Sequence, residues 1–192
     1  SDSAMRRVRV FNEDPTFNGT VAVDDDNISA GAATTFSGRF TDAGSRDSHT
    51  ITIDFGDGDV ISSDDNPGRF SVFNDYGSFG RFVASKRFDS GGIFDTITTI
   101  EDEDGGIERS RETLFIAGVG LDPETGELQI VASENATEAS VFGSNAGAAG
   151  GRSLASNSAA GPQANFDLVT VNTTIPGQRT QSFDASLVKT VR

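Results

Sequence analysis

The chain has 192 residues and a net charge of −14 at pH 7, from 29 acidic and 15 basic side chains. It has no Cys and one His, which leaves no thiol nucleophile and no zinc site of the usual His/Cys kind. The acidity disfavours nucleic acid and anionic membranes as partners, and no apolar run is long enough to predict membrane insertion.

The composition favours strands over helices. Val, Ile and Thr together number 43 and Phe numbers 15, whereas Leu numbers only 6. Short alternating segments recur between Gly, Asp and Asn turns, and in the segment 50–55 the alternate residues Ile51, Ile53 and Phe55 should face one core. The sequence therefore predicts an all-β fold, whose first seven strands cover residues 20–24, 33–41, 50–55, 69–73, 81–88, 93–100 and 108–116.

Four segments in this region carry a family resemblance. They read FSGRFTDAG at 36–44, SHTITIDFGDG at 48–58, FVASKRF at 82–88 and DEDGG at 102–106. In this order and spacing they resemble the polycystin-repeat (PKD) domains of large bacterial surface proteins, over residues 16–118. The resemblance implies an immunoglobulin-like β-sandwich. Residues 1–15, which precede it, are predicted to form an arm or linker.

The sequence departs from the family pattern at three places. Phe55 stands where the family usually has Trp, and Lys86-Arg87-Phe88 replaces its usual His-x-Tyr, which removes a hydrogen-bonding corner residue. In the segment 93–100 the family register leaves Ile93 and Ile97 on the outer face. Either the register is shifted or that face is covered. The residues that this register turns inward are Phe94, Thr96, Thr98 and Ile100.

The second half of the chain, residues 119–192, predicts a smaller β-domain. A turn at 120–126 leads into a strand that ends at Val131, and further strands are predicted at 138–142, 165–173 and 186–191. The run 143–163 is rich in Ala, Gly, Ser and Asn, so we expect a flexible loop there. This half resembles, more loosely, the segment that leads into calcium-binding glycine-aspartate repeats, but those repeats are absent.

Acidic turns are the candidate metal site. One acidic turn holds Asp42 and Asp47, and the other holds Asp102 and Asp104. Loops that follow alternate strands of a sandwich gather at one end, so these two turns could supply several oxygens to one Ca²⁺, the cofactor that the sequence suggests. Some PKD domains of secreted proteases bind calcium at loops that resemble these. The alternative is that Asp and Gly simply form the turns. The candidate calcium ligands are Asp42, Asp47, Asp102 and Asp104.

Other polar groups do not predict catalysis. Asp57 and Asp59 could be imagined as a glycosidase pair, but a water-exposed turn offers neither a substrate groove nor a raised pKa. His49 is expected to be a surface or packing residue, and the acidic run 24–27 a solvated linker. We therefore expect no enzyme.

Two function classes remain. The leading prediction is an extracellular structural or adhesion module of a bacterial surface or secreted protein, stiffened by calcium. The alternative is a carbohydrate-binding accessory module of a secreted hydrolase, with a glycan as partner. Sugar-binding faces usually present exposed aromatic residues, and the absence of Trp and the single Tyr, Tyr76, argue against the alternative.

The basic segment near the start of the chain predicts self-association. Arg6, Val8 and Val10 form a strand-like arm with no place in a sandwich that begins near residue 20, and donation of this strand to a neighbouring copy would build a filament. The alternative is the tail of a preceding domain in a tandem protein. Residues 1–9 lack the apolar segment of a signal peptide. Because Ser-Asp-Ser-Ala precedes the only Met, Met5, we expect a processed or excised chain.

Overall fold

The computed structural model describes residues 12–24, 28–44, 47–66, 68–75, 79–131, 139–144, 152–154, 168–173, 180–184 and 186–192. Every regular element in these ranges is a β-strand, which confirms the all-β prediction. They contain no helix that is long and apolar enough to cross a membrane. The chain divides into two compact units: residues 1–22, 36–84 and 97–111 form the first, and residues 23–35, 85–96 and 112–192 the second. The predicted domain boundary at residue 118 stays a prediction.

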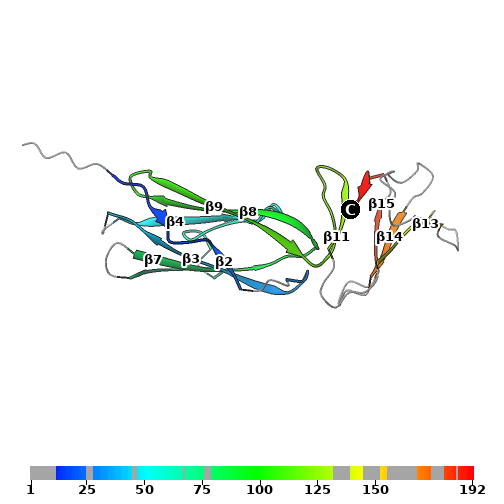
Figure 1. Cartoon of the computed structure of the whole chain (residues 1–192), viewed down its shortest axis with the longest axis horizontal. Coiled ribbons are helices and arrows are strands. Elements are labelled where there is room, and N and C mark those ends of the chain that lie inside the picture. The colour runs from blue at the N-terminus through cyan, green and yellow to red at the C-terminus, as the bar shows by residue number, and fades with distance from the viewer. Residues whose placement is uncertain are drawn as a thin grey trace, which may run out of the picture. The chain divides into compact units, whose positions relative to one another are not determined.

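The described residues up to Ile116 form two antiparallel sheets (Figure 1). The strands of both sheets come from distant parts of the sequence, as a sandwich requires. One sheet has the order β1 (Thr16–Phe17), β3 (Ala33–Thr41), β7 (Phe79–Arg87) and β6 (Phe70–Asp75), with β2 (Ala22–Val23) also paired to β3. The other has the order β5 (Val60–Ser62), β4 (His49–Asp54), β8 (Gly92–Asp102) and β9 (Ile107–Ile116).

The core of the first unit consists of inward-facing side chains from both sheets. Ile51, Ile53 and Phe55 are fully buried, as their alternation predicts. Phe36 of β3 meets Phe55, which follows β4, in an edge-to-face contact with 5.1 Å between ring centroids. This contact joins the two sheets and confirms the sandwich architecture, with Phe55 occupying the core position where the family has Trp.

Strand β8 keeps the register that the family resemblance implies. Thr96, Thr98 and Ile100 are buried, while Ile93 and Ile97 are half-buried, so the alternative of a shifted register is wrong. Thr96 satisfies its buried hydroxyl by donating to the carbonyl oxygen of Glu112 at 3.1 Å. A buried Thr therefore fits a core position here because the neighbouring strand supplies the acceptor.

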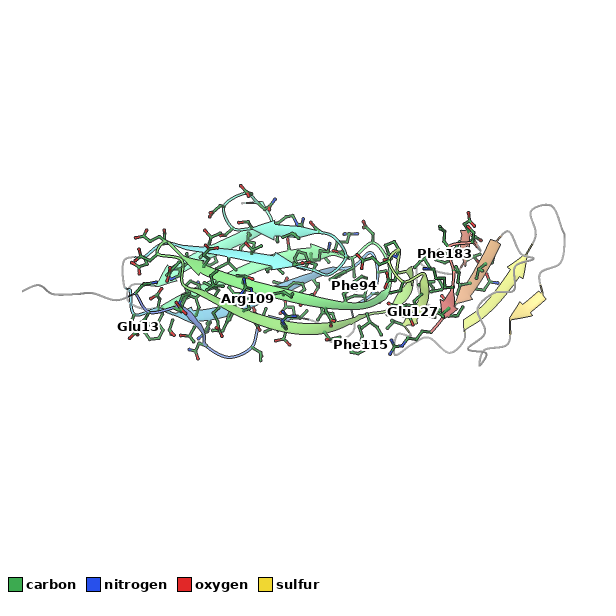
Figure 2. The ribbon with its side chains drawn as sticks, turned by 90° about the horizontal axis from the view of Figure 1, so that it is seen from above. Glu13, Phe94, Arg109, Phe115, Glu127 and Phe183 are labelled. Atoms are coloured by element: carbon green, nitrogen blue, oxygen red, sulfur yellow. The ribbon has the colours of Figure 1, made fainter. Side chains whose placement is uncertain are left out.

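The second unit contains a direct passage from β9 into a hairpin. Ala117 alone separates β9 from β10 (Gly118–Leu121), and its N–H donates to the carbonyl oxygen of Ile28 at 2.7 Å. Strand β10 pairs with β11 (Glu127–Val131), which in turn runs parallel to β16 (Thr190–Val191). In the same unit, Phe94 lies half-buried at 5.1 Å from Phe88, whereas Phe115 is exposed; both Phe94 and Phe115 are labelled in Figure 2.

A further sheet of the second unit has the order β13 (Arg152–Leu154), β12 (Ala139–Ser144), β14 (Leu168–Thr173) and β15 (Thr180–Asp184). Apolar residues from β10, β11 and β14 share one buried cluster, which places these strands around a common core. The buried members of this cluster are Val119, Leu128, Val169, Val171 and Val188.

Two predictions for the second half need correction. The predicted loop 143–163 contains β13, because main-chain pairing with β12 requires no apolar side chains. The predicted strand 186–191 is reduced to Thr190–Val191. Asp184 stops it by accepting hydrogen bonds from the N–H of Ser186 at its carboxylate and of Leu187 at its carbonyl, which form a turn.

Candidate functional site

The two predicted acidic turns lie at one end of the first unit. Asp42 directly follows β3, Asp102 ends β8, and His49, which begins β4, is the cross-strand partner of Asp102. Partial desolvation of the Asp47 carboxyl raises its pKa, and the neighbouring carboxylates of Asp42, Glu103, Asp104 and Asp102 raise it further. The structure thus brings together all four predicted residues. With Glu103, they are called the acidic end below.

Asp42 is a buried carboxylate with two partners. One of its oxygens accepts a hydrogen bond from the Gly44 N–H at 2.7 Å, and the other lies 2.7 Å from Nε2 of His49. The His49 ring is 6% exposed and packs against Phe40 with 4.8 Å between centroids. His49 is therefore a packing residue, as the sequence predicts, and Nδ1 of its ring has no hydrogen-bond partner among the described residues.

Asp102 organises the second turn from its centre. Its Oδ1 accepts hydrogen bonds from the N–H groups of Asp104 at 2.9 Å and Gly106 at 2.8 Å, and its Oδ2 accepts one from the Asn12 amide at 2.9 Å. The Asn12 hydrogen bond lowers the pKa of Asp102 most, burial opposes this, and the backbone donors of Gly106, Asp104 and Gly105 lower it further. The folded protein therefore favours the ionised carboxylate.

The two buried carboxylates limit what metal the acidic end can hold. Both oxygens of Asp42 and both oxygens of Asp102 already meet a donor or His49. Within the described ranges, no group of three or more His, Asp or Glu side chains is arranged to hold a metal ion. This arrangement leaves Asp42 and Asp102 fewer free lone pairs for a shared Ca²⁺, and calcium binding by the four predicted residues stays a prediction for experiment.

The carboxylates of the turn at 54–59 form contacts that stabilise the turn itself. Asp59 forms an ion pair with Arg69 at 2.8 Å, and the Asp57 carboxylate accepts the Asp59 N–H at 3.1 Å. Gly56 and Gly58 have φ angles of +74° and +86°, which a residue with a Cβ adopts only with strain. These carboxylates hold the turn in place.

Sequence reasoning missed two residues that complete the acidic end. The sequence predicts a turn or linker at Asn12, although its amide donates to Asp102 at 2.9 Å, and it does not predict the pairing of His49 with Asp42. The spacing of Asp42 and His49, on either side of a strand-to-strand turn, was a usable signal for the second contact. No local sequence pattern predicts the contact between Asn12 and Asp102, because the two residues are 90 positions apart. Residues 1–11, with the predicted arm, and Asp25–Asn27 of the acidic run lie outside the described residues.

Comparison with known proteins finds no matching family model and no matching curated protein. Among solved structures, the chain is similar to a PKD domain of an M14-like peptidase from Thermoplasmatales archaeon SCGC AB-540-F20. That match has 18% identity and a TM-score of 0.42, and it covers 55% of this chain and 98% of the other. The PKD1 domain of Vibrio anguillarum Epp matches with 15% identity and a TM-score of 0.38, over 56% and 99% of the two chains.

A third similar structure is described as one of the carbohydrate-binding modules from the β-sandwich superfamily. It has 11% identity and a TM-score of 0.41, and it covers 85% of this chain and 55% of the other. All three TM-scores lie below 0.5, so these likenesses assign no function to the chain.

Proposed function

We propose that the chain is a non-catalytic structural module of a bacterial surface or secreted protein, which joins a β-sandwich to a following β-domain without a flexible linker. The observation that carries this proposal is the passage from β9 to β10 in the second unit. Ala117, the one residue between these strands, donates its N–H to Ile28 and accepts the N–H of Ala30 at 2.9 Å. Both hydrogen bonds go to the segment 28–30, where Ser29 and Ala117 form a parallel bridge. A segment that is paired with a neighbouring segment in this way transmits tension and orientation, which a solvated linker does not.

Close backbone contacts reinforce this passage. The N–H of Gly91 donates to the carbonyl oxygen of Val119 at 3.2 Å, and the N–H of Ile93 donates to the Gln129 amide oxygen at 2.9 Å. A Cβ on Gly91 would lie 2.1 Å from the carbonyl carbon of Gly118, and a Cβ on Gly120 would lie 2.0 Å from the carbonyl oxygen of Gly91. Only glycines allow the two backbones to approach this closely.

Hydrogen exchange tests the proposal. We expect the amides of Ala117 and Ile93 to exchange as slowly as those of the buried strand β4, because both N–H groups donate short hydrogen bonds to acceptors inside the fold. Gly91→Ala should lower the free energy of unfolding by about 3 kcal/mol through the backbone clash. Gly68→Ala is the matched control, since a Cβ there meets nothing within 4 Å.

Two results would contradict the structural proposal. Fast exchange at Ala117, at the rate of an open turn, would make the passage an ordinary linker. A Gly91→Ala variant as stable as the Gly68→Ala control would show that the close backbone contact does not hold the passage together.

The surface location needs a separate experiment. The proposed module should be accessible to antibody and to added protease on intact cells of the source organism. Detection only after lysis would contradict the extracellular assignment, while leaving the linker-free passage itself in place.

Calcium stiffening is a subordinate proposal with its own test. If the acidic end binds calcium, the melting temperature should rise in a saturable way over millimolar calcium, because binding favours the folded state. Asp47→Asn and Asp104→Asn should reduce that rise. Equal melting curves in chelator, calcium and matched ionic strength would reject the proposal.

Strand donation by the N-terminal arm is also a proposal. The deletion that tests it should remove residues 1–11 and keep Asn12, because Asn12 donates to Asp102 and its loss would disturb the acidic end. A shift from oligomer to folded monomer in light scattering would support donation. Unchanged size would favour the alternative of a tandem-domain tail.

A further inference from the structure

The outer face of β6 and β7 carries aromatic and basic side chains on an otherwise acidic protein. Phe73 and Arg81 are cross-strand partners, and Phe79 lies two residues before Arg81 on the same face. Phe79 is 60% exposed and Phe73 is 43% exposed. Covering these exposed aromatic rings with a ligand would remove apolar area from water and stabilise the complex, so the face is a candidate interaction site.

A hollow of about 340 Å³ lies next to this face, inside the first unit. This volume is within the usual range for small-ligand sites. Its lining residues include two arginines, two phenylalanines and one asparagine, and we call it the arginine hollow. The lining residues are Asn18, Arg39, Phe40, Phe79, Gly80 and Arg81.

The strands place these residues with little freedom. The Phe40 ring packs against Gly80 so closely that a Cβ on Gly80 would lie 2.2 Å from it. Arg39 precedes Phe40 and therefore points to the opposite, outer face of β3. Asn18 is held beside Arg39 because its N–H donates to the Arg39 carbonyl oxygen at 2.8 Å. The arginine hollow is thus built on paired strands.

The charges of the arginine hollow are positioned without being neutralised. Cζ of Arg81 lies 4.7 Å from the centroid of the Phe73 ring, a cation–π contact that orients the guanidinium and keeps its charge. Neither Arg39 nor Arg81 forms an ion pair with a described residue. Arg69, by contrast, pairs with Asp59 through two nitrogens.

We propose that the arginine hollow binds a carboxylated sugar, such as a single uronic acid residue. A uronate carries a carboxylate, which Arg39 and Arg81 can bind through paired N–H donors. It also carries an apolar ring face that can pack on Phe79, and hydroxyl groups within reach of the Asn18 amide. A single charged sugar suits the site better than a long polyanion, since the net charge of −14 repels the latter.

The test is a nuclear magnetic resonance titration of the full chain with three small probes. Methyl glucuronide carries the sugar and the carboxylate, methyl glucoside lacks the carboxylate, and N-acetylglutamate amide carries a carboxylate without a sugar. We expect methyl glucuronide to shift the signals of Arg39, Phe79 and Arg81 with a Kd of about 1 mM, as a ligand of this size allows. The other two probes should bind at least about tenfold more weakly.

Variants locate the binding to the arginine hollow. Arg39→Ala and Arg81→Ala should each weaken methyl glucuronide at least about tenfold, and Arg81→Lys should weaken it less, since Lys keeps the charge but not the fork of donors. Phe79→Ala should weaken it several-fold. Arg109→Ala is the matched control, because Arg109 is an exposed arginine on β9 of the other sheet (Figure 2), and its Kd should stay within about twofold.

Three outcomes overturn the proposal. Absence of shifts at ten times the expected Kd would show that the hollow holds no such ligand. If methyl glucoside bound as tightly as methyl glucuronide, the carboxylate would not contribute to binding, and Arg39 and Arg81 would not have the proposed role. Equal or tighter binding of N-acetylglutamate amide would make the ligand an acidic peptide. None of these outcomes bears on the exchange rate of Ala117, so the structural proposal is tested separately.

Discussion

At the acidic end the buried carboxylates accept hydrogen bonds from the chain itself, whereas in the arginine hollow the guanidinium groups meet no described carboxylate. Both places concentrate like charges in the first unit. The Asp102 carboxylate accepts three hydrogen bonds and the residue is 5% exposed, while Arg81 is exposed and its guanidinium lies over the ring of Phe73. A charged side chain that accepts hydrogen bonds from backbone N–H groups of its own loop stabilises that loop. A charged side chain without such partners remains available for a ligand.

Removal of Asp102 should break the acidic end and give the largest effect. Asp102→Ala leaves the N–H groups of Asp104 and Gly106 without their acceptor, and we expect the free energy of unfolding to fall by about 3 kcal/mol. Chemical denaturation measures this. Glu101→Ala, at the exposed neighbouring position of β8, should change stability by less than about 0.5 kcal/mol. Equal stability of the two variants would show that the hydrogen bonds of Asp102 are dispensable.

The His49–Asp42 pair should give the next largest effect. His49→Ala removes a buried ring from Phe40 and leaves the Asp42 carboxylate with the Gly44 N–H as its remaining partner, at a cost of about 2 kcal/mol. His49→Gln, which can still donate to Asp42, should recover part of the loss in thermal unfolding. A glutamine variant no more stable than the alanine variant would assign the whole effect to packing.

Acid should weaken the acidic end in a defined range. The folded-state pKa of Asp102 lies below its ordinary value of 3.8, so its contribution is complete above about pH 5 and is lost as pH falls through the lowered value. Asp102→Asn should flatten this part of the stability profile. Asp47 has a raised pKa and acts in the opposite sense, so Asp47→Asn should steepen the net acid loss. Parallel profiles for all three proteins would contradict the assignment.

The arginine hollow should give the smallest effect on stability. Arg39→Ala and Arg81→Ala should each change the free energy of unfolding by less than about 0.5 kcal/mol, because no described ion pair or buried hydrogen bond of these side chains is lost. Denaturation of the variants used in the binding experiment provides the measurement. A loss of several kcal/mol would place the arginines among the stabilising groups and erase the contrast with the acidic end.

Long alternating segments made much of the sandwich predictable. The strand predicted at 33–41 matches β3 in full, and the buried Ile51 and Ile53 follow directly from their spacing. Strands β1 and β5 have two and three residues, too few for any alternation to be visible, and their pairing is decided by neighbours. Short strands therefore escape sequence reasoning even where long ones do not.

The two sites differ in how visible they were. The acidic end could be predicted because its residues follow strands, and strand ends on one side of a sandwich meet. The arginine hollow is not predicted, because the strand predicted at 81–88 starts two residues after β7 does, at Phe79, and so hides the outward alternation of Phe79 and Arg81. Absence of Trp also argued against a sugar-binding face, although Phe73 and Phe79 present exposed rings. Tyr76, the other residue of that argument, lies outside the described residues.

The contact among Gly91, Gly118 and Gly120 has a consequence for how this fold can vary. Two missing side chains, those of Gly91 and Gly120, specify the geometry there, so most single nucleotide changes at these two codons would insert atoms between the backbone segments. Surface loops of the same protein accept such changes freely. The passage from β9 to β10 should therefore be inherited as an indivisible unit, and recombination between related modules should succeed when its crossover points leave all three glycines in one parent.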